Sequence, residues 1–140
     1  IKKIKLKDHK FTKLILTENF LKYIDLDMFN NLTALKQLQL SRNRIEFVHM
    51  RAFENLVNLE FVDFNENNLR YLPNNLFLNQ SKFTTLYLSS NKIEIIKSNQ
   101  FKGIENSLKE LELNNNKLKI IKYYYFYGLI KLEILFLSQN

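Results

Sequence analysis

The sequence repeats itself with a period of 24 residues, and a period of this length decides the architecture of a chain before any local pattern does. Phenylalanine recurs at spacings of 24, 24, 24 and 25 residues, at Phe29, Phe53, Phe77, Phe101 and Phe126. Asparagine recurs in the same phase, at spacings of 24, 24, 24, 25 and 24 residues, at Asn19, Asn43, Asn67, Asn91, Asn116 and Asn140. Two residue types that share one phase indicate a stack of similar units.

The repeat predicts one solenoid domain over 1–140. Its units are 11–34, 35–58, 59–82, 83–107 and 108–131, followed by a partial unit at 132–140. Apolar residues occupy unit positions 1, 4, 6, 11, 14, 19 and 22, and Asn occupies position 9. No unit can bury its apolar side chains alone, so stability must come from stacking on its neighbours. The one inserted residue falls near 105–107, where a loop can absorb it.

Short strands are expected near the start of each unit. The triplets 38–40, 86–88 and 111–113 alternate apolar and polar residues, which is typical of a strand with one buried face. Strands 24 residues apart must pair in parallel, because so long a connection does not form a tight hairpin. The Asn at position 9 follows the strand, where its amide can satisfy backbone groups left unpaired by the turn. Loss of one such amide should cost ~1–3 kcal/mol.

The pattern LxxLxLxxNxLxxLxxxxFxxLxx resembles the leucine-rich-repeat family over most of the chain. A 24-residue unit with Phe at position 19 is similar to the typical extracellular subclass. The resemblance implies an α/β-type solenoid that is mostly β: a right-handed superhelix with a curved parallel sheet on its concave face. Loops and short extended or 3-10 segments would form the convex face. Only Pro73 retains the proline that this subclass often has at position 15.

The two ends differ from the repeat. Five lysines and one aspartate give residues 1–10 a net charge of +4, out of +7 for the chain. These lysines alternate with Ile4 and Leu6, which predicts an N-terminal capping strand with one basic face; a nucleic-acid site is the alternative for the same cluster. At the other end, Leu132, Leu135 and Leu137 form a strand face with no polar closing segment after them. We therefore expect the natural protein to continue beyond 140.

Composition argues against catalysis. The chain has 2 His, 2 Gly and no Cys, so it lacks the parts of a thiolate site, a glycine-rich phosphate loop or a nucleophile–base pair. We expect no enzyme activity, no cofactor and no metal site. No apolar run approaches the roughly 20 residues needed to span a bilayer, so no membrane span is expected within this chain.

Strand positions 3, 5 and 8 should point out of the concave sheet, where packing does not choose the residue. Register places Phe61 beside Tyr87, with acidic residues around them. Aromatic side chains ringed by charge are typical of a protein-binding hot spot, and an acidic sheet repels nucleic acid. The alternative is that these are solvated strand faces. The candidate ligand-binding residues are Gln39, Arg42, Phe61, Asp63, Glu66, Tyr87, Glu110 and Glu112.

Two further features lie outside the expected strands. Phe126 is surrounded by four tyrosines: Tyr123, Tyr124, Tyr125 and Tyr127. If this segment is extended, alternate tyrosines face outward and form a convex interface. The alternative is that they are partly buried against the next unit. The sequons Asn31-Leu32-Thr33 and Asn79-Gln80-Ser81 share unit position 21, which favours N-glycosylation of Asn31 and Asn79 in the secretory pathway.

The leading functional hypothesis is a non-enzymatic recognition module that holds a protein ligand or co-receptor on its concave sheet. The resemblance implies a fragment of an extracellular receptor ectodomain or secreted protein, of the kind found in innate immunity or cell adhesion. The alternatives are an assembly segment that forms a homodimer through the Tyr123–Tyr127 side, and an intracellular scaffold. Fold resemblance implies recognition in general and names no ligand.

Overall fold

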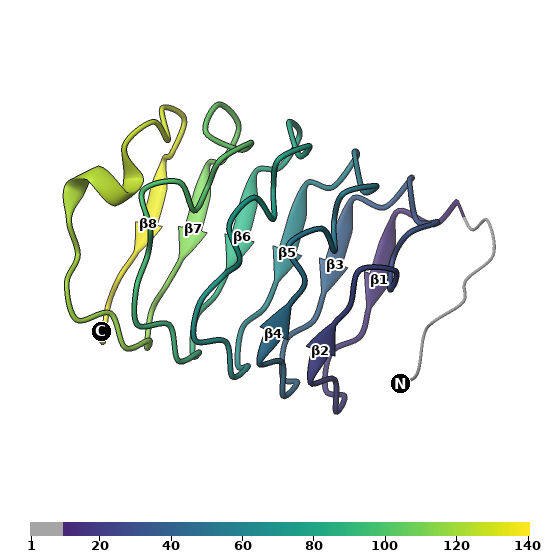
Figure 1. Ribbon diagram of the computed structural model, residues 1–140, viewed down its shortest axis with the longest axis horizontal. Coiled ribbons are helices and arrows are strands. Elements are labelled where there is room, and N and C mark those ends of the chain that lie inside the picture. Colours follow the sequence, from purple (N-terminus) through teal and green to yellow (C-terminus); the bar gives the residue numbers. More distant parts are fainter. Residues whose placement is uncertain (1–9) are drawn as a thin grey trace.

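The computed structural model describes residues 10–140, and the capping strand predicted for 1–10 lies outside the described residues except for its last residue. The described chain winds into a solenoid of repeated turns, with a six-stranded parallel sheet along one side (Figure 1). Its strands are β1 (Lys13–Ile15), β3 (Gln37–Gln39), β5 (Phe61–Asp63), β6 (Thr85–Tyr87), β7 (Glu110–Glu112) and β8 (Ile134–Phe136). The parallel solenoid predicted from the 24-residue period is confirmed.

Strand register follows the repeat. Each residue of one strand pairs with the residue 24 positions later, as Leu38 does with Val62, except that β6 and β7 pair at 25 positions. The extra residue is absorbed in a turn: the Leu108 N–H donates to the Ile104 carbonyl, four residues back. The corresponding N–H groups of Leu59 and Phe83 reach only three residues back. The strands begin one residue before the predicted triplets, because position 3 already joins the ladder.

The core lies between the sheet and the loops of the opposite side. Four phenylalanines of unit position 19 are buried, and neighbouring rings are 6.4 Å apart between Phe29 and Phe53 and 6.2 Å apart between Phe53 and Phe77. Phe126, expected in the same row, is only partly buried and stacks on Phe101 at 6.4 Å. The repeated apolar positions thus form one continuous core along the solenoid.

The position-9 asparagines form a ladder of hydrogen bonds between units. The side-chain amide of Asn67 donates to the Leu40 carbonyl of the preceding unit (3.0 Å) and to the Phe64 carbonyl of its own (3.0 Å), and its oxygen accepts the Ile45 N–H (2.9 Å). Four members of the ladder are buried: Asn43, Asn67, Asn91 and Asn116. Each amide therefore replaces backbone partners that the turn after the strand cannot supply.

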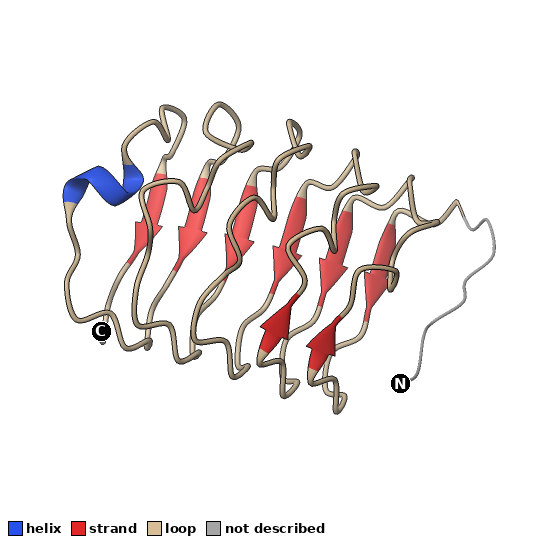
Figure 2. Cartoon of the chain, in the orientation of Figure 1, coloured by secondary structure: helices blue, strands red, loops and turns tan. Residues whose placement is uncertain are grey.

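The side opposite the main sheet contains little regular structure (Figure 2). Two short strands, β2 (Tyr23–Ile24) and β4 (Phe47–Val48), pair there in parallel. The His49 N–H donates to the Ile24 carbonyl, and the equivalent residue of the next unit is Pro73, which has no N–H, so this sheet is not extended by a third strand. In the described part of the chain, the helical structure is one 3-10 turn, η1 (Tyr123–Phe126).

Candidate functional site

The centre of the concave sheet carries a pair of aromatic side chains. Phe61 projects from β5 and Tyr87 from β6, and their rings meet edge to face with centroids 5.2 Å apart. Both side chains are half-buried. Val62 of β5 and Leu86 of β6 point to the other face of the sheet and are buried in the core. The pair therefore offers a rigid apolar surface to solvent.

Carboxylates surround this aromatic pair. Asp63 lies opposite Tyr87 in the register, and Glu112 lies opposite Tyr87 on the other side. Burial raises the pKa of Tyr87 above its usual value, and the negative charges of Glu110 and Glu112 raise this pKa further. The Tyr87 side chain is therefore a neutral phenol at physiological pH, and its hydroxyl is hydrogen-bonded to the Glu110 side chain.

Next to the pair is a hollow of about 280 Å³ in the concave sheet. Phe61 lines it together with Gln39, which is half-buried. Glu60 lies at its rim and pairs with Lys36 at 2.9 Å. Its remaining lining residues are Gln37, Thr84 and Thr85. Sequence reasoning missed Glu60 and Thr84 because they occupy unit position 2, next to the core position that starts the unit.

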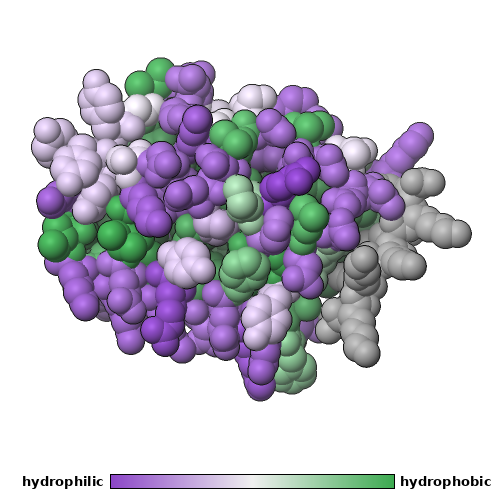
Figure 3. Space-filling model, viewed as in Figure 1, coloured by the Kyte–Doolittle hydropathy of each residue, from purple (hydrophilic) through white to green (hydrophobic). Residues whose placement is uncertain are grey.

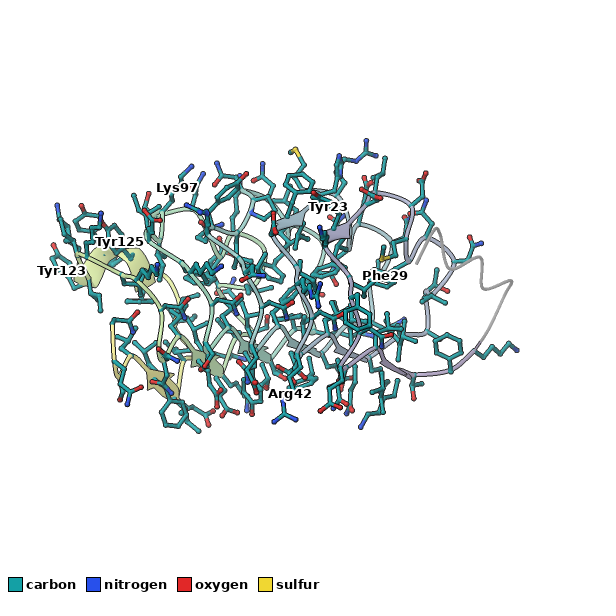
Figure 4. The ribbon with its side chains drawn as sticks, turned by 90° about the horizontal axis from the view of Figure 1, so that it is seen from below. Tyr23, Phe29, Arg42, Lys97, Tyr123 and Tyr125 are labelled. Carbon is teal, nitrogen blue, oxygen red and sulfur yellow. The ribbon has the colours of Figure 1, made fainter. Side chains whose placement is uncertain are left out.

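A row of ion pairs crosses one edge of the concave sheet. The Arg42 guanidinium bonds to Glu18 at 2.7 Å and to Glu66 at 3.0 Å, all three at unit position 8 of successive units. The hydrogen bonds to Glu18 and Glu66 raise the pKa of Arg42 further above its usual value. Arg42 and Glu66, both predicted to bind a ligand, are thus engaged with each other. Figure 4 shows Arg42 projecting on the side of the sheet, away from Tyr23.

Position 8 also has an unusual backbone that the sequence does not signal. Its residues are in the left-handed region with φ between 51° and 59°: Glu18, Arg42, Glu66, Ser90, Asn115 and Gln139. This region favours Gly, Asn and Asp, whereas most of these residues belong to other types. In all of them except Gln139, the backbone N–H donates to a carbonyl of the next unit, as when the Arg42 N–H donates to the Asn65 carbonyl at 3.0 Å. The turn directs these side chains along the sheet edge and makes the ion-pair row possible.

The tyrosine cluster differs from its predicted form. Tyr123–Phe126 is the 3-10 turn η1, so the side chains do not alternate as they would on an extended segment. Tyr124 contacts Tyr123 and Tyr125 edge to face, at 5.8 Å and 4.9 Å. Tyr123 and Tyr127 are 86% and 82% exposed, whereas Tyr125 packs against the core. The cluster thus presents two highly exposed aromatic side chains, and Figure 4 shows Tyr123 at one end of the solenoid.

Both sequon asparagines, Asn31 and Asn79, are exposed in turns outside the strands. Between residues 10 and 140, no group of three or more His, Asp or Glu side chains is arranged to hold a metal ion. The same residues include no helix long and apolar enough to cross a membrane.

Comparison with known proteins agrees with this architecture. A family model described as a BspA type leucine rich repeat region matches residues 1–133 with six copies. The chain is 25% identical to the Drosophila Toll structure solved in complex with Spatzle (TM-score 0.80) and to the structure of the TLR13–ssRNA13 complex (TM-score 0.68). Each likeness covers 92% of this chain but only 19% and 22%, respectively, of those chains, so this chain spans about a fifth of their length. A comparison with curated proteins finds no match.

Proposed function

Since this chain belongs to the BspA-type leucine-rich-repeat family, we propose that it is a non-enzymatic recognition module that holds a protein ligand on its concave sheet. The observation that carries the proposal is the Phe61–Tyr87 pair, held half-exposed at the centre of the sheet beside a hollow of about 280 Å³. Aromatic anchors in a partly desolvated surface supply most of the binding free energy in protein interfaces.

Charge favours a protein over a nucleic acid as the ligand. The outward positions of the strands carry seven acidic and four basic residues, which gives this face a net charge of −3 although the whole chain is +7. A negative surface repels the phosphate backbone of a nucleic acid. A ligand with basic residues around an apolar centre would complement the acidic and aromatic side chains of the sheet.

The decisive variant carries Phe61→Ala and Tyr87→Ala together. Wild-type and variant chains are immobilised and incubated with proteins secreted by the source cells, and captured proteins are quantified by mass spectrometry. We expect at least one protein to be captured by the wild type and reduced about tenfold or more by the variant, because the anchors are lost while the core is untouched. If no captured protein depends on these two residues, the concave-sheet proposal is wrong.

A matched control removes two exposed aromatic side chains away from the sheet, by Tyr123→Ala with Tyr127→Ala. This control should leave ligand capture unchanged. The same variant tests the alternative of an assembly surface, which the high exposure of both tyrosines favours. Loss of self-association in this variant, measured by sedimentation, with no effect of the Phe61→Ala, Tyr87→Ala variant on capture, would support assembly instead of recognition.

We also propose that the chain is extracellular and glycosylated, as an ectodomain segment of a receptor or secreted protein of immunity or adhesion. The exposure of Asn31 and Asn79 supports this, since an acceptor asparagine must be accessible. On protein from a eukaryotic secretory host, peptide mass spectrometry should find glycan on both asparagines and none after Thr33→Ala and Ser81→Ala. Empty sites in the wild type would count against secretion and favour an intracellular scaffold.

A further inference from the structure

The face opposite the concave sheet carries a continuous row of exposed apolar side chains. One residue from unit position 13 of each unit contributes to this row, with exposed fractions between 38% and 60%: Tyr23, Phe47, Tyr71, Ile95 and Ile120. We refer to these five residues as the outer row. Position 14, the next residue, is buried in the first four units, as Ile24 and Val48 are, whereas Ile121 of the fifth unit is 44% exposed. Unit position 13 therefore faces solvent, and every complete unit carries a large apolar residue there.

The row is continuous because the units stack in register. Tyr23 of β2 and Phe47 of β4 are direct partners in a parallel pair, and the other members occupy the same place in later units. Figure 3 shows this face, where apolar and weakly polar side chains cross the middle between hydrophilic ones. Paired strands lie about 4.8 Å apart, so four steps between units give a row at least about 19 Å long, the length of about six extended residues or more.

Basic residues flank the outer row. The segments that carry it, 20–25, 44–49, 68–73, 92–97 and 117–122, contain eight basic and three acidic residues, a net charge of +5. The basic residues are Lys22, Arg44, Arg70, Lys92, Lys97, Lys117, Lys119 and Lys122. This sign is opposite to that of the concave sheet. The two faces of the solenoid therefore suit different partners.

A hollow of about 350 Å³ lies within this face. Tyr23, Phe47 and Tyr71 line it together with Arg70 and Lys92. The Arg70 side chain is 72% exposed, and the ion pair recorded for it, with Glu94, is a loose one of 3.8 Å. Arg70 is therefore available to a carboxylate placed in the hollow, and the rings of Tyr23, Phe47 and Tyr71 form the apolar part of the lining, against which a neighbouring side chain can pack.

We propose that the outer row is a second binding face, which takes an acidic, extended segment of a partner protein with apolar side chains between its carboxylates. Charge complementarity selects an acidic partner, and the row of apolar side chains selects one with apolar residues. The hollow receives side chains, which favours a peptide over a flat lipid surface.

The test uses the 140-residue chain and a fluorescein-labelled dodecapeptide of the repeat Glu-Glu-Leu, followed by fluorescence anisotropy. We expect saturable binding to the wild type, at least tenfold weaker binding to the variant Arg70→Glu with Lys92→Glu, and at least fivefold weaker binding to Phe47→Ser. The matched control is Lys102→Glu with Lys131→Glu, which makes the same charge change outside the outer row and should bind as the wild type does. A peptide of the repeat Lys-Lys-Leu should not bind.

Several results would overturn the proposal. The first is that the wild type does not bind the acidic peptide. The second is that the Lys102→Glu, Lys131→Glu control loses as much affinity for the peptide as the Arg70→Glu, Lys92→Glu variant does. The third is that the Phe61→Ala, Tyr87→Ala variant loses peptide binding instead. Tighter binding of a single-stranded RNA dodecamer, or of vesicles rich in phosphatidylserine, would show that the partner class is wrong. The Phe61→Ala, Tyr87→Ala variant keeps the outer row intact. The two binding faces are therefore tested separately, and either proposal can fail alone.

Discussion

Replacement of Gly103 by Ala is expected to lower the free energy of unfolding by about 3 kcal/mol, through backbone strain combined with a steric clash. Gly103 has a φ of 101°, a conformation that L side chains rarely adopt. A Cβ at this position would collide with the Phe77 carbonyl oxygen and would lie 2.6 Å from the Leu78 Cα, both in the backbone of the preceding unit. Neither atom can move without shifting the stack. Urea unfolding followed by circular dichroism measures the effect.

Gly128 provides the matched control. It occupies the same unit position and also has a positive φ, of 91°, but the nearest atom to its added Cβ is the Glu105 Cγ at 3.9 Å. Gly128→Ala therefore meets only the backbone penalty and should cost about 1 kcal/mol. Equal losses in the two variants would show that the backbone conformation alone, without the approach of the preceding unit, sets the requirement for glycine.

Replacement of Asn67 by Ala is the second change with a large expected effect. The variant leaves the buried Ile45 N–H without its partner and removes donors from the Leu40, Phe64 and Asn65 carbonyls. We expect a loss of about 3 kcal/mol in the free energy of unfolding, at the upper end of the cost of unsatisfied buried groups. The Leu40 and Phe64 carbonyls still accept hydrogen bonds from Asn43 and Asn91. The loss in the free energy of unfolding is therefore limited, and the chain still folds.

Asn19→Ala tests whether the cost comes from joining two units. Asn19 is half-buried at the start of the described ladder and donates to the Leu16 and Thr17 carbonyls of its own unit. Its replacement should cost under about 1 kcal/mol, the net value of an ordinary hydrogen bond. A loss as large as that of Asn67→Ala would contradict the view that the ladder stabilises the solenoid mainly through contacts between units.

Part of the candidate site followed from the sequence. The 24-residue register predicted that Phe61 and Tyr87 would be neighbours on the outward face of the sheet, and their rings are 5.2 Å apart. The ion pairs of Arg42 could not be predicted, because they depend on a left-handed residue that its own type does not favour. The 3-10 turn at Tyr123–Phe126 was not predicted either, since an extended segment was expected there.

The sequence by itself determined the repeating unit, the parallel pairing of the strands, and the identity of most core residues. These properties follow from a pattern of burial that recurs every 24 residues, and each unit displays that pattern within its own residues. Only the tertiary structure decided the properties that arise between units. Stacking places the Gly103 backbone against Phe77, joins Glu18, Arg42 and Glu66 into one row, and aligns Tyr23 with Phe47 on the outer face. The burial pattern does not fix which residues occupy the polar and exposed positions. The contacts of those residues depend on the distances and directions that stacking of the units creates.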